Sequence, residues 1–229
     1  MTIFITGSTG YVGKALTQTL LDRGHQVIVL VREGSSKKLG ALADKVTIRH
    51  GDITDPDTID LTGADAIIHL VAIIKEIKSQ DITFEKVNYK AALNVMDAAK
   101  KQNIRRFLFM SAAGHPPLLL KAYYTTKIKG EDYLKTTDLS WTIFRPSLIF
   151  GTRFLGKSMG WIKYFRWIFR LGGHLPLIGP LCQKWTPISL DEISRAFTHA
   201  VEDQGLTGQT LMGKSLHQLA AKPLSPKRP

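Results

Sequence analysis

The sequence predicts an α/β fold, a doubly wound parallel sheet followed by a small C-terminal region. Short apolar runs alternate with amphipathic stretches, which is typical of parallel strands joined by crossover helices. Because such crossovers are right-handed in nearly all proteins, this chain order favours a doubly wound sheet. The expected strands are residues 2–6, 26–31, 46–50, 66–70, 106–110 and 141–144.

Apolar residues at helical spacing predict the crossover helices at residues 11–23 and 83–102. After Gly151 the alternation gives way to glycine, proline and aromatic residues, and only residues 191–201 and 209–212 resume it, as a helix and a strand. We therefore divide the chain into residues 1–150, the sheet domain, residues 151–212, a variable region on the substrate side, and residues 213–229, which we expect to be a disordered tail.

The composition excludes several classes of protein. A content of 44% hydrophobic and 22% charged residues is that of an ordinary globular chain. The apolar runs are far shorter than the roughly 20 residues that cross a bilayer, and no signal peptide is expected. The one cysteine, Cys182, cannot form an internal disulfide, and no metal-type cluster is apparent. We therefore expect a metal-free protein in the cytoplasm.

The net charge of +12 is concentrated in two segments. Residues 151–190 contain six basic residues and no acid, and residues 213–229 contain four basic residues and no acid, so together they hold ten of the twelve charges. The rest of the chain is close to neutral. This distribution disfavours nucleic acid as a partner.

A glycine-rich turn follows the first expected strand and begins the first expected helix. In it, Gly7 permits a tight turn, Gly10 lets the backbone approach a pyrophosphate, and Gly13 lets helix and strand pack closely. The N-terminus of the helix offers N–H donors to phosphate groups. A flexible turn with incidental glycines is the alternative. The predicted phosphate-binding residues are Gly7, Ser8, Thr9, Gly10, Tyr11, Val12 and Gly13.

The second strand ends with a base where NAD-specific sites usually have an acid. Arg32 stands at this point, and Ser35, Ser36, Lys37 and Lys38 follow it. A guanidinium can bind a 2′-phosphate at two points and stack on adenine, so NADP(H) is predicted in preference to NAD(H). Glu33 is a rival signal for NAD, and a solvated surface arginine is the other alternative.

Asp52 and Ile53 follow the third expected strand, where the carboxylate can accept a hydrogen bond from an adenine amino group. Asp55, which precedes Pro56, can equally mark a helix start.

Tyr123 and Lys127 are four residues apart in an expected helix and so share one face. Lowering a tyrosine pKa from about 10 to about 7 needs roughly 4 kcal/mol, which an ammonium and a positively charged nicotinamide can supply. Ser111, at the end of the fifth strand, can orient a substrate hydroxyl or carbonyl. By itself the Tyr-x-x-x-Lys spacing usually marks only an exposed helix face.

Several motifs resemble those of extended or atypical short-chain dehydrogenases/reductases, which have an NAD(P)-binding Rossmann fold: TGSTGYVG, VREG, GDITD, VN at Val87–Asn88, SAAG, YYTTK with GE, and RPSLIFG. The sequence is most similar to the branch of sugar-nucleotide epimerase-like proteins and of the nucleotide-binding accessory subunit of respiratory complex I. The resemblance covers residues 1–151 well and continues more loosely to about residue 212.

The resemblance implies roles for individual residues. Tyr123 would act as acid/base, Lys127 would bind the nicotinamide ribose and Ser111 would orient the substrate, while Pro146 would border the nicotinamide. After the fourth strand, HLVAII replaces the usual Asn-Ala-Gly type of turn. We therefore expect only backbone contacts to the cofactor there, from Leu70, Val71 and Ala72.

The segment 157–171 combines aromatic and basic residues. If it is helical, Lys163, Arg166 and Arg170 form a basic stripe beside a broad apolar surface. It is interpreted as a lid over the cofactor domain, as a helix in a membrane interface, or as a protein interface. A peripheral contact with the inner face of a membrane, or with a membrane complex, is the partner that this segment suggests.

Two functions follow from the sequence. The first is an NADP(H)-dependent oxidoreductase or epimerase, in which Tyr123 exchanges a proton with an unidentified small molecule. The second is a non-catalytic NADP(H)-binding subunit or redox sensor associated with a membrane complex.

Overall fold

A computed structural model describes residues 1–114, 121–150, 153–154, 157–158 and 185–224, and it confirms the predicted α/β fold. Within these residues, a seven-stranded sheet has the order β11-β6-β5-β4-β1-β2-β3, and all of its strands are parallel. Its strands are β1 (Thr2–Thr6), β2 (Gln26–Val31), β3 (Thr47–His50), β4 (Ala66–His69), β5 (Arg106–Met110), β6 (Ser140–Arg145) and β11 (Gln209–Met212).

The chain enters this sheet at its centre. It runs outward from β1 through β2 to β3, crosses over to β4, and continues in the other direction through β5 and β6 to β11. The strand order therefore reverses between β1 and β4. In doubly wound sheets, ligands bind outside the carboxyl ends of the strands at this point of reversal.

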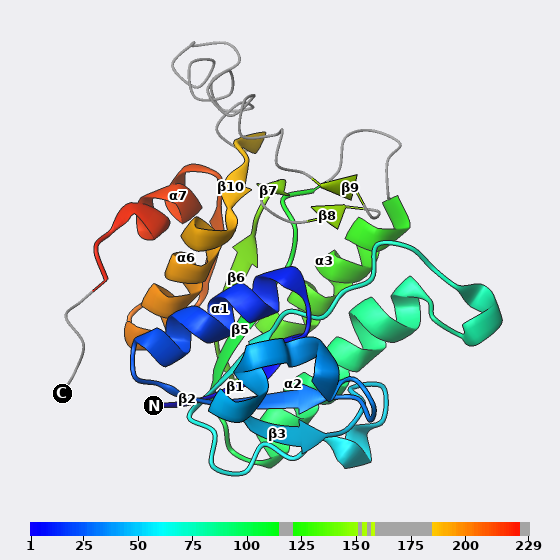
Figure 1. Ribbon diagram of the computed structural model, residues 1–229. Coiled ribbons are helices and arrows are strands. Elements are labelled where there is room, and N and C mark those ends of the chain that lie inside the picture. The colour runs from blue at the N-terminus through cyan, green and yellow to red at the C-terminus, as the bar shows by residue number, and fades with distance from the viewer. Residues whose placement is uncertain (115–120, 151–152, 155–156, 159–184, 225–229) are drawn as a thin grey trace.

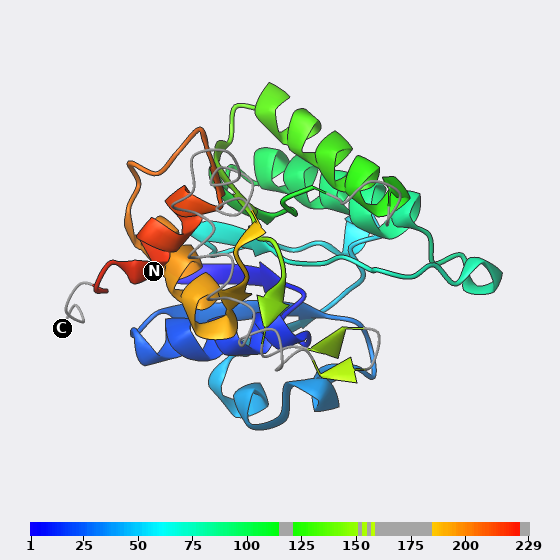
Figure 2. The same ribbon diagram turned by 90° about the horizontal axis from the view of Figure 1, so that it is seen from above.

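Helices cover both faces of the sheet (Figures 1 and 2). One face carries α1 (Tyr11–Asp22), α6 (Leu190–Glu202) and α7 (Lys214–Ala221), and the other carries α2 (Ala91–Lys101) and α3 (Lys121–Thr136). A π-helical turn, η4 (Glu85–Lys90), leads directly into α2, so the helix predicted at residues 83–102 is present with a wider first part. None of the described helices is both long and apolar enough to span a bilayer.

Shorter elements connect this framework. The 3₁₀ helix η1 (Ser36–Lys45) joins β2 to β3, and η2 (Pro56–Thr58) and η3 (Lys78–Gln80) lie on either side of β4 in the chain. Two small pairs of strands complete the described part: β7 (Ile149–Phe150) with β10 (Ile188–Ser189), and β8 (Arg153–Phe154) with β9 (Lys157–Ser158).

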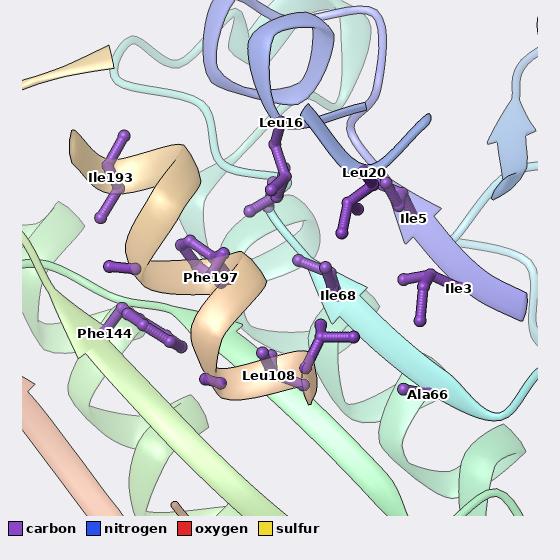
Figure 3. Close-up of a cluster of buried hydrophobic side chains, with 14 of the residues drawn as sticks. Ile3, Ile5, Leu16, Leu20, Ala66, Ile68, Leu108, Phe144, Ile193 and Phe197 are labelled. Carbon is purple, nitrogen blue, oxygen red and sulfur yellow. The ribbon is translucent and has the colours of Figure 1, made fainter. Parts of the chain in front are cut away.

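The apolar side chains form one core on each face of the sheet. Figure 3 shows the first, in which Leu16 and Leu20 of α1 and Phe197 of α6 pack over the strands. Phe197 stacks on Phe144 with the ring centroids 3.8 Å apart. Since a fully buried side chain of this size contributes about 1.5–3 kcal/mol, α6 is integral to the domain although it begins 40 residues after the predicted boundary at residue 150.

The C-terminal segment is partly helical, so one prediction was wrong. Residues 213–229 were expected to be a disordered tail, but α7 occupies part of them and packs against α6. Leu216, Leu219 and Ala220 are buried, because their helical spacing places them on one face. Residues 225–229 lie outside the described part of the chain. So does most of the aromatic and basic segment 157–171, of which only residues 157–158 are placed.

Candidate functional site

The glycine-rich turn holds the start of α1 against the carboxyl end of β1. Gly7 has a φ of +84°, and its carbonyl accepts a hydrogen bond of 3.0 Å from the Gly10 N–H. A Cβ at Gly13 would lie 2.2 Å from the Gly7 oxygen, which no side chain could tolerate. The turn therefore requires glycine for close packing, and it directs the first N–H groups of α1 toward the point where the strand order reverses.

A cavity of about 550 Å³ opens at this point. It runs from the turn along the carboxyl ends of β1, β2 and β4. The predicted residues in its wall are Gly7, Thr9, Gly10, Arg32, Asp52, Ile53, Leu70, Val71 and Ala72. The predicted residues Ser8, Tyr11, Val12, Gly13, Lys127 and Pro146 are not among the described residues of that wall.

One end of the cavity is basic. Arg32, Ser35 and Lys38 line it, whereas Glu33 is not part of the wall, although Arg32 and Glu33 are both exposed. Within the described part of the chain, Arg32 has no carboxylate partner. The described wall therefore includes the arginine and not its acidic neighbour.

Asp52 stabilises its own turn. Its Oδ1 accepts hydrogen bonds from the backbone N–H and the hydroxyl of Thr54, each 2.9 Å long. The carboxylate nevertheless belongs to the cavity wall. Asp55 accepts from the Asp57 N–H at the start of η2, with Pro56 at the first helical position, as its helix-start interpretation predicted.

A further wall comes from a segment in which only the motif residues Val87 and Asn88 were singled out from the sequence. After β4 the chain forms a loop that projects from the body (teal in Figures 1 and 2), and it then returns to the cavity. Asn88 anchors this segment, because its side chain bonds both the N–H of Ile73 (2.7 Å) and its carbonyl (3.0 Å). The wall residues from it are Ile73, Gln80, Asp81, Ile82, Lys86 and Val87.

Lys127 is a buried amine near the carboxyl end of β5. Its side chain is 1% exposed, and its Nζ lies 4.5 Å from the centre of the Phe109 ring. Burial lowers the pKa of Lys127 to about 7, although Glu131 partly opposes the shift. Neither the Lys127 Nζ nor the buried Ser111 Oγ has a hydrogen-bond partner among the described residues. Buried polar atoms without a partner are uncommon in folded proteins, and this distinguishes the two residues.

The environment of Tyr123 differs from the sequence-based expectation. Its ring contacts Phe84 edge-on at 6.0 Å and Tyr124 at 5.0 Å. Burial, and secondarily Tyr124, raises the pKa of Tyr123 above its usual value. The protein alone therefore keeps this hydroxyl protonated at neutral pH. Lys127 is not among the groups that shift the pKa of Tyr123.

These features fit an elongated ligand with phosphate groups. Backbone N–H donors, the basic end at Arg32 and the open apolar wall suit phosphates and a flat base. Lys127, Ser111 and Tyr123 do not belong to the described wall of this cavity, and the Lys127 Nζ and Ser111 Oγ are buried without a partner among the described residues. Among the described residues, no group of three or more His, Cys, Asp or Glu side chains could hold a metal ion.

Comparisons with known proteins agree with this geometry. A family model described as the NAD dependent epimerase/dehydratase family matches residues 3–211. The chain is 29% identical, over 92% of its own length and 52% of the relative's, to NADH dehydrogenase [ubiquinone] 1 alpha subcomplex subunit 9, mitochondrial, of Arabidopsis thaliana. It is 30% identical to the ceramide reductase of Caulobacter vibrioides, over 79% of this chain and 54% of that protein.

These matches place the chain beside longer proteins, since it spans about half the length of both curated relatives. Among solved structures, an oxidoreductase from Lactococcus lactis has the same fold, with a TM-score of 0.68 and 22% sequence identity. That match covers 96% of this chain and 95% of the other.

Proposed function

The chain belongs to the NAD dependent epimerase/dehydratase family, and on this premise we propose that its cavity binds NADP(H) in preference to NAD(H). The observation that carries the proposal is the placement of Arg32 in the cavity wall with Glu33 outside it. A guanidinium binds a phosphate at two points, whereas a carboxylate in that place would bind a ribose diol. Ser35 and Lys38 add a hydroxyl and a second cation to the same end.

The remaining residues suit the other parts of the dinucleotide. The N–H groups at the start of α1 would bind the pyrophosphate, and Asp52 and Ile53 would border the adenine. Lys127 would bind the nicotinamide ribose, and Pro146 would border the nicotinamide. When bound, the cofactor supplies or accepts a hydride.

We propose that the chemistry is oxidoreduction or epimerisation of a small molecule. Tyr123 would give its proton to a substrate oxygen, because a tyrosine with a raised pKa is fully protonated at neutral pH. Ser111 would donate a hydrogen bond to the same oxygen. An ammonium at Lys127, recharged by contact with ribose oxygens, would then favour loss of the tyrosine proton.

A second candidate function is a cofactor-binding subunit without turnover. The raised pKa of Tyr123 supports it, because the described residues alone do not activate this group. The similarity to a subunit of a mitochondrial NADH dehydrogenase supports it too. In this case segment 157–171 would attach the cytoplasmic protein to a membrane complex at the inner face of the membrane.

Calorimetric titration of NADPH and NADH tests the proposed cofactor. We expect Arg32→Ala to weaken NADPH binding at least about tenfold while NADH binding stays unchanged, because a charge-assisted contact is worth about 1.5–3 kcal/mol. Lys37→Ala is the matched control, since Lys37 is exposed, adjacent in sequence and not part of the described wall. Equal losses for the two cofactors would contradict the proposal.

Tyr123→Phe separates the two functions. Loss of turnover with intact NADPH affinity, set against a functional Tyr124→Phe control, identifies an enzyme. A wild-type protein that binds NADPH and turns over no carbonyl, alcohol or sugar-nucleotide substrate is the result expected of the binding subunit.

A further inference from the structure

A row of side chains crosses the sheet directly beneath the candidate site. The strand register aligns these residues, and all belong to the face covered by α2 and α3, since they alternate with the residues of the opposite core. Two of them are polar and the rest are apolar. In spatial order they are Leu30, Thr6, His69, Phe109 and Ile143.

The two polar members bind each other. The Thr6 Oγ1 and the His69 Nδ1 lie 2.9 Å apart, and both side chains are fully buried. The imidazole ring also stacks on Phe107 and on Phe109, at centroid distances of 6.4 and 5.7 Å. The ring is thus fixed on three sides, while its second nitrogen, Nε2, has no partner among the described residues.

The Lys127 Nζ lies over the same Phe109 ring, 4.5 Å from its centre. Two polar atoms, the His69 Nε2 and the Lys127 Nζ, are therefore both buried, both unpartnered in the described part of the chain and both beside one phenylalanine. Buried polar groups are nearly always paired, because an unpaired one costs about 1–3 kcal/mol.

We propose that His69 is a positioning residue whose Nε2 is linked to the Lys127 Nζ through one buried water, from which it accepts a hydrogen bond, in a ring orientation and tautomer set by Thr6. The inference rests on the proposed function, in which Lys127 contacts the ligand. In this arrangement the Thr6 hydroxyl accepts from the Nδ1–H, which leaves a lone pair on Nε2. An N–H in that position would repel an ammonium.

The charges around His69 and Lys127 are consistent with this role. Burial, and secondarily Lys127, lowers the pKa of His69 to about 3, so the ring stays neutral and keeps its acceptor. On α3, Glu131 also acts on Lys127, but the Arg145 guanidinium of β6 binds that carboxylate at both oxygens. Near by, Glu85 of η4 pairs with Lys129, and Asp97 of α2 accepts from Tyr133.

The first test is the tautomer of His69 in the wild-type protein, which needs no variant to fold. Long-range ¹H–¹⁵N spectra of histidine-labelled protein distinguish the two ring nitrogens, and His69→Gln assigns the signal. We expect a protonated Nδ1 and an unprotonated Nε2 between about pH 5 and pH 8. A protonated Nε2 would overturn the proposal.

The second test is the titration of Lys127 in the cofactor-free protein, followed by the ¹³Cε resonance of labelled lysine. Thr6→Val removes the partner that sets the tautomer. His69→Asn retains an amide near Nδ1 and removes the acceptor at Nε2. In both we expect the midpoint, near 7 in the wild type, to fall by about one pH unit, because an acceptor favours the charged amine.

Thr17→Val is the matched control, because it removes the hydroxyl of another fully buried threonine, on α1. Thr6→Ser retains the hydroxyl and should restore the wild-type midpoint. A midpoint in Thr6→Val equal to that in Thr17→Val would overturn the role of His69. Because no cofactor is present, this result is independent of the NADPH titration, whose failure would instead remove the proposed function.

Discussion

Two buried cations lie at opposite ends of the same region of sheet, and their surroundings are opposite in kind. Arg106 begins β5, and its guanidinium donates to the carbonyls of Ser140 (2.9 Å), Ala200 (2.6 Å) and Leu206 (3.2 Å). Lys127 lies near the carboxyl end of the strand, and its Nζ has no such partner among the described residues. At the amino end, backbone carbonyls thus pair two guanidinium nitrogens and the Arg106 Nε alone lacks a partner among the described residues, whereas at the carboxyl end the whole amine of Lys127 is unpartnered.

The shifts in pKa follow the same division. Burial lowers the pKa of Arg106 to about 10, so the guanidinium keeps its charge at neutral pH. The same cause lowers the pKa of Lys127 to about 7, where charged and neutral forms coexist. A buried cation is therefore stabilising where the chain supplies acceptors, and is sensitive to its surroundings where it does not.

The largest expected effect concerns Arg106, at the amino end of β5. Arg106→Met should lower the free energy of unfolding by about 3 kcal/mol or more, because three carbonyls lose their donor in a buried place. Urea unfolding measures it. The neighbouring Arg105→Met is the control, since Arg105 is exposed and its ion pair with Asp138 is worth less than about 1 kcal/mol. Equal losses of stability in the two variants would contradict a structural role for the buried hydrogen bonds of Arg106.

Lys127→Met should have the opposite sign. We expect it to raise the stability of the cofactor-free protein at pH 7 by roughly 1–3 kcal/mol, because a poorly solvated amine is replaced by an apolar chain. The expected cost is weaker NADPH binding. Lys129→Met, at an exposed position of the same helix, should change neither quantity measurably.

The pH dependence sharpens this prediction. Between about pH 7, the folded pKa, and 10.5, the usual one, the unfolded chain binds a proton at Lys127 that the folded chain does not. Wild-type stability should therefore rise with pH through this window relative to Lys127→Met. Denaturant unfolding at several pH values measures the difference, and parallel curves would show that Lys127 is well solvated.

The smallest effect concerns Ser111. Its Oγ is buried and has no partner in the described chain, so Ser111→Ala should raise stability by about 1 kcal/mol, because an unpaired buried hydroxyl destabilises the folded state. If the protein is an enzyme, turnover should fall at least about tenfold with cofactor affinity unchanged. Thermal unfolding measures the stability, and NADPH calorimetry measures the cofactor affinity. A marked loss of stability would mean that the hydroxyl has a structural partner.

The sequence was most informative where local rules determine the structure. Strands buried on both faces appear as continuous apolar runs, so six were predicted nearly to their bounds, and the handedness of the crossovers favoured a doubly wound sheet. The turn was equally readable, since the spacing of Gly7, Gly10 and Gly13 reflects contacts within a few residues. The prediction that Arg32 binds a phosphate rests on the same kind of local reasoning, from its position directly after β2.

The rest depends on contacts between distant segments. Nothing in the sequence around Gln80 or Lys86 shows that this loop returns to the cavity, because the Asn88 side chain fixes its path through Ile73. The spacing of Tyr123 and Lys127 predicts a shared face but not the depth at which the face is buried. Their shifts in pKa depend on that depth.

The packing of α1 on α6 has a consequence for synthesis of the protein. Leu16 and Leu20 leave the ribosome long before Phe197, which helps to cover them, because Phe197 lies far downstream in the chain. The ion pair of Arg23 with Glu202 joins the same two distant segments. Since chains emerge at about 5–20 residues per second, the first helix waits for many seconds with its apolar face uncovered. Until α6 is made, the apolar face of α1 therefore needs cover from a chaperone or from transient contacts with other parts of the nascent chain.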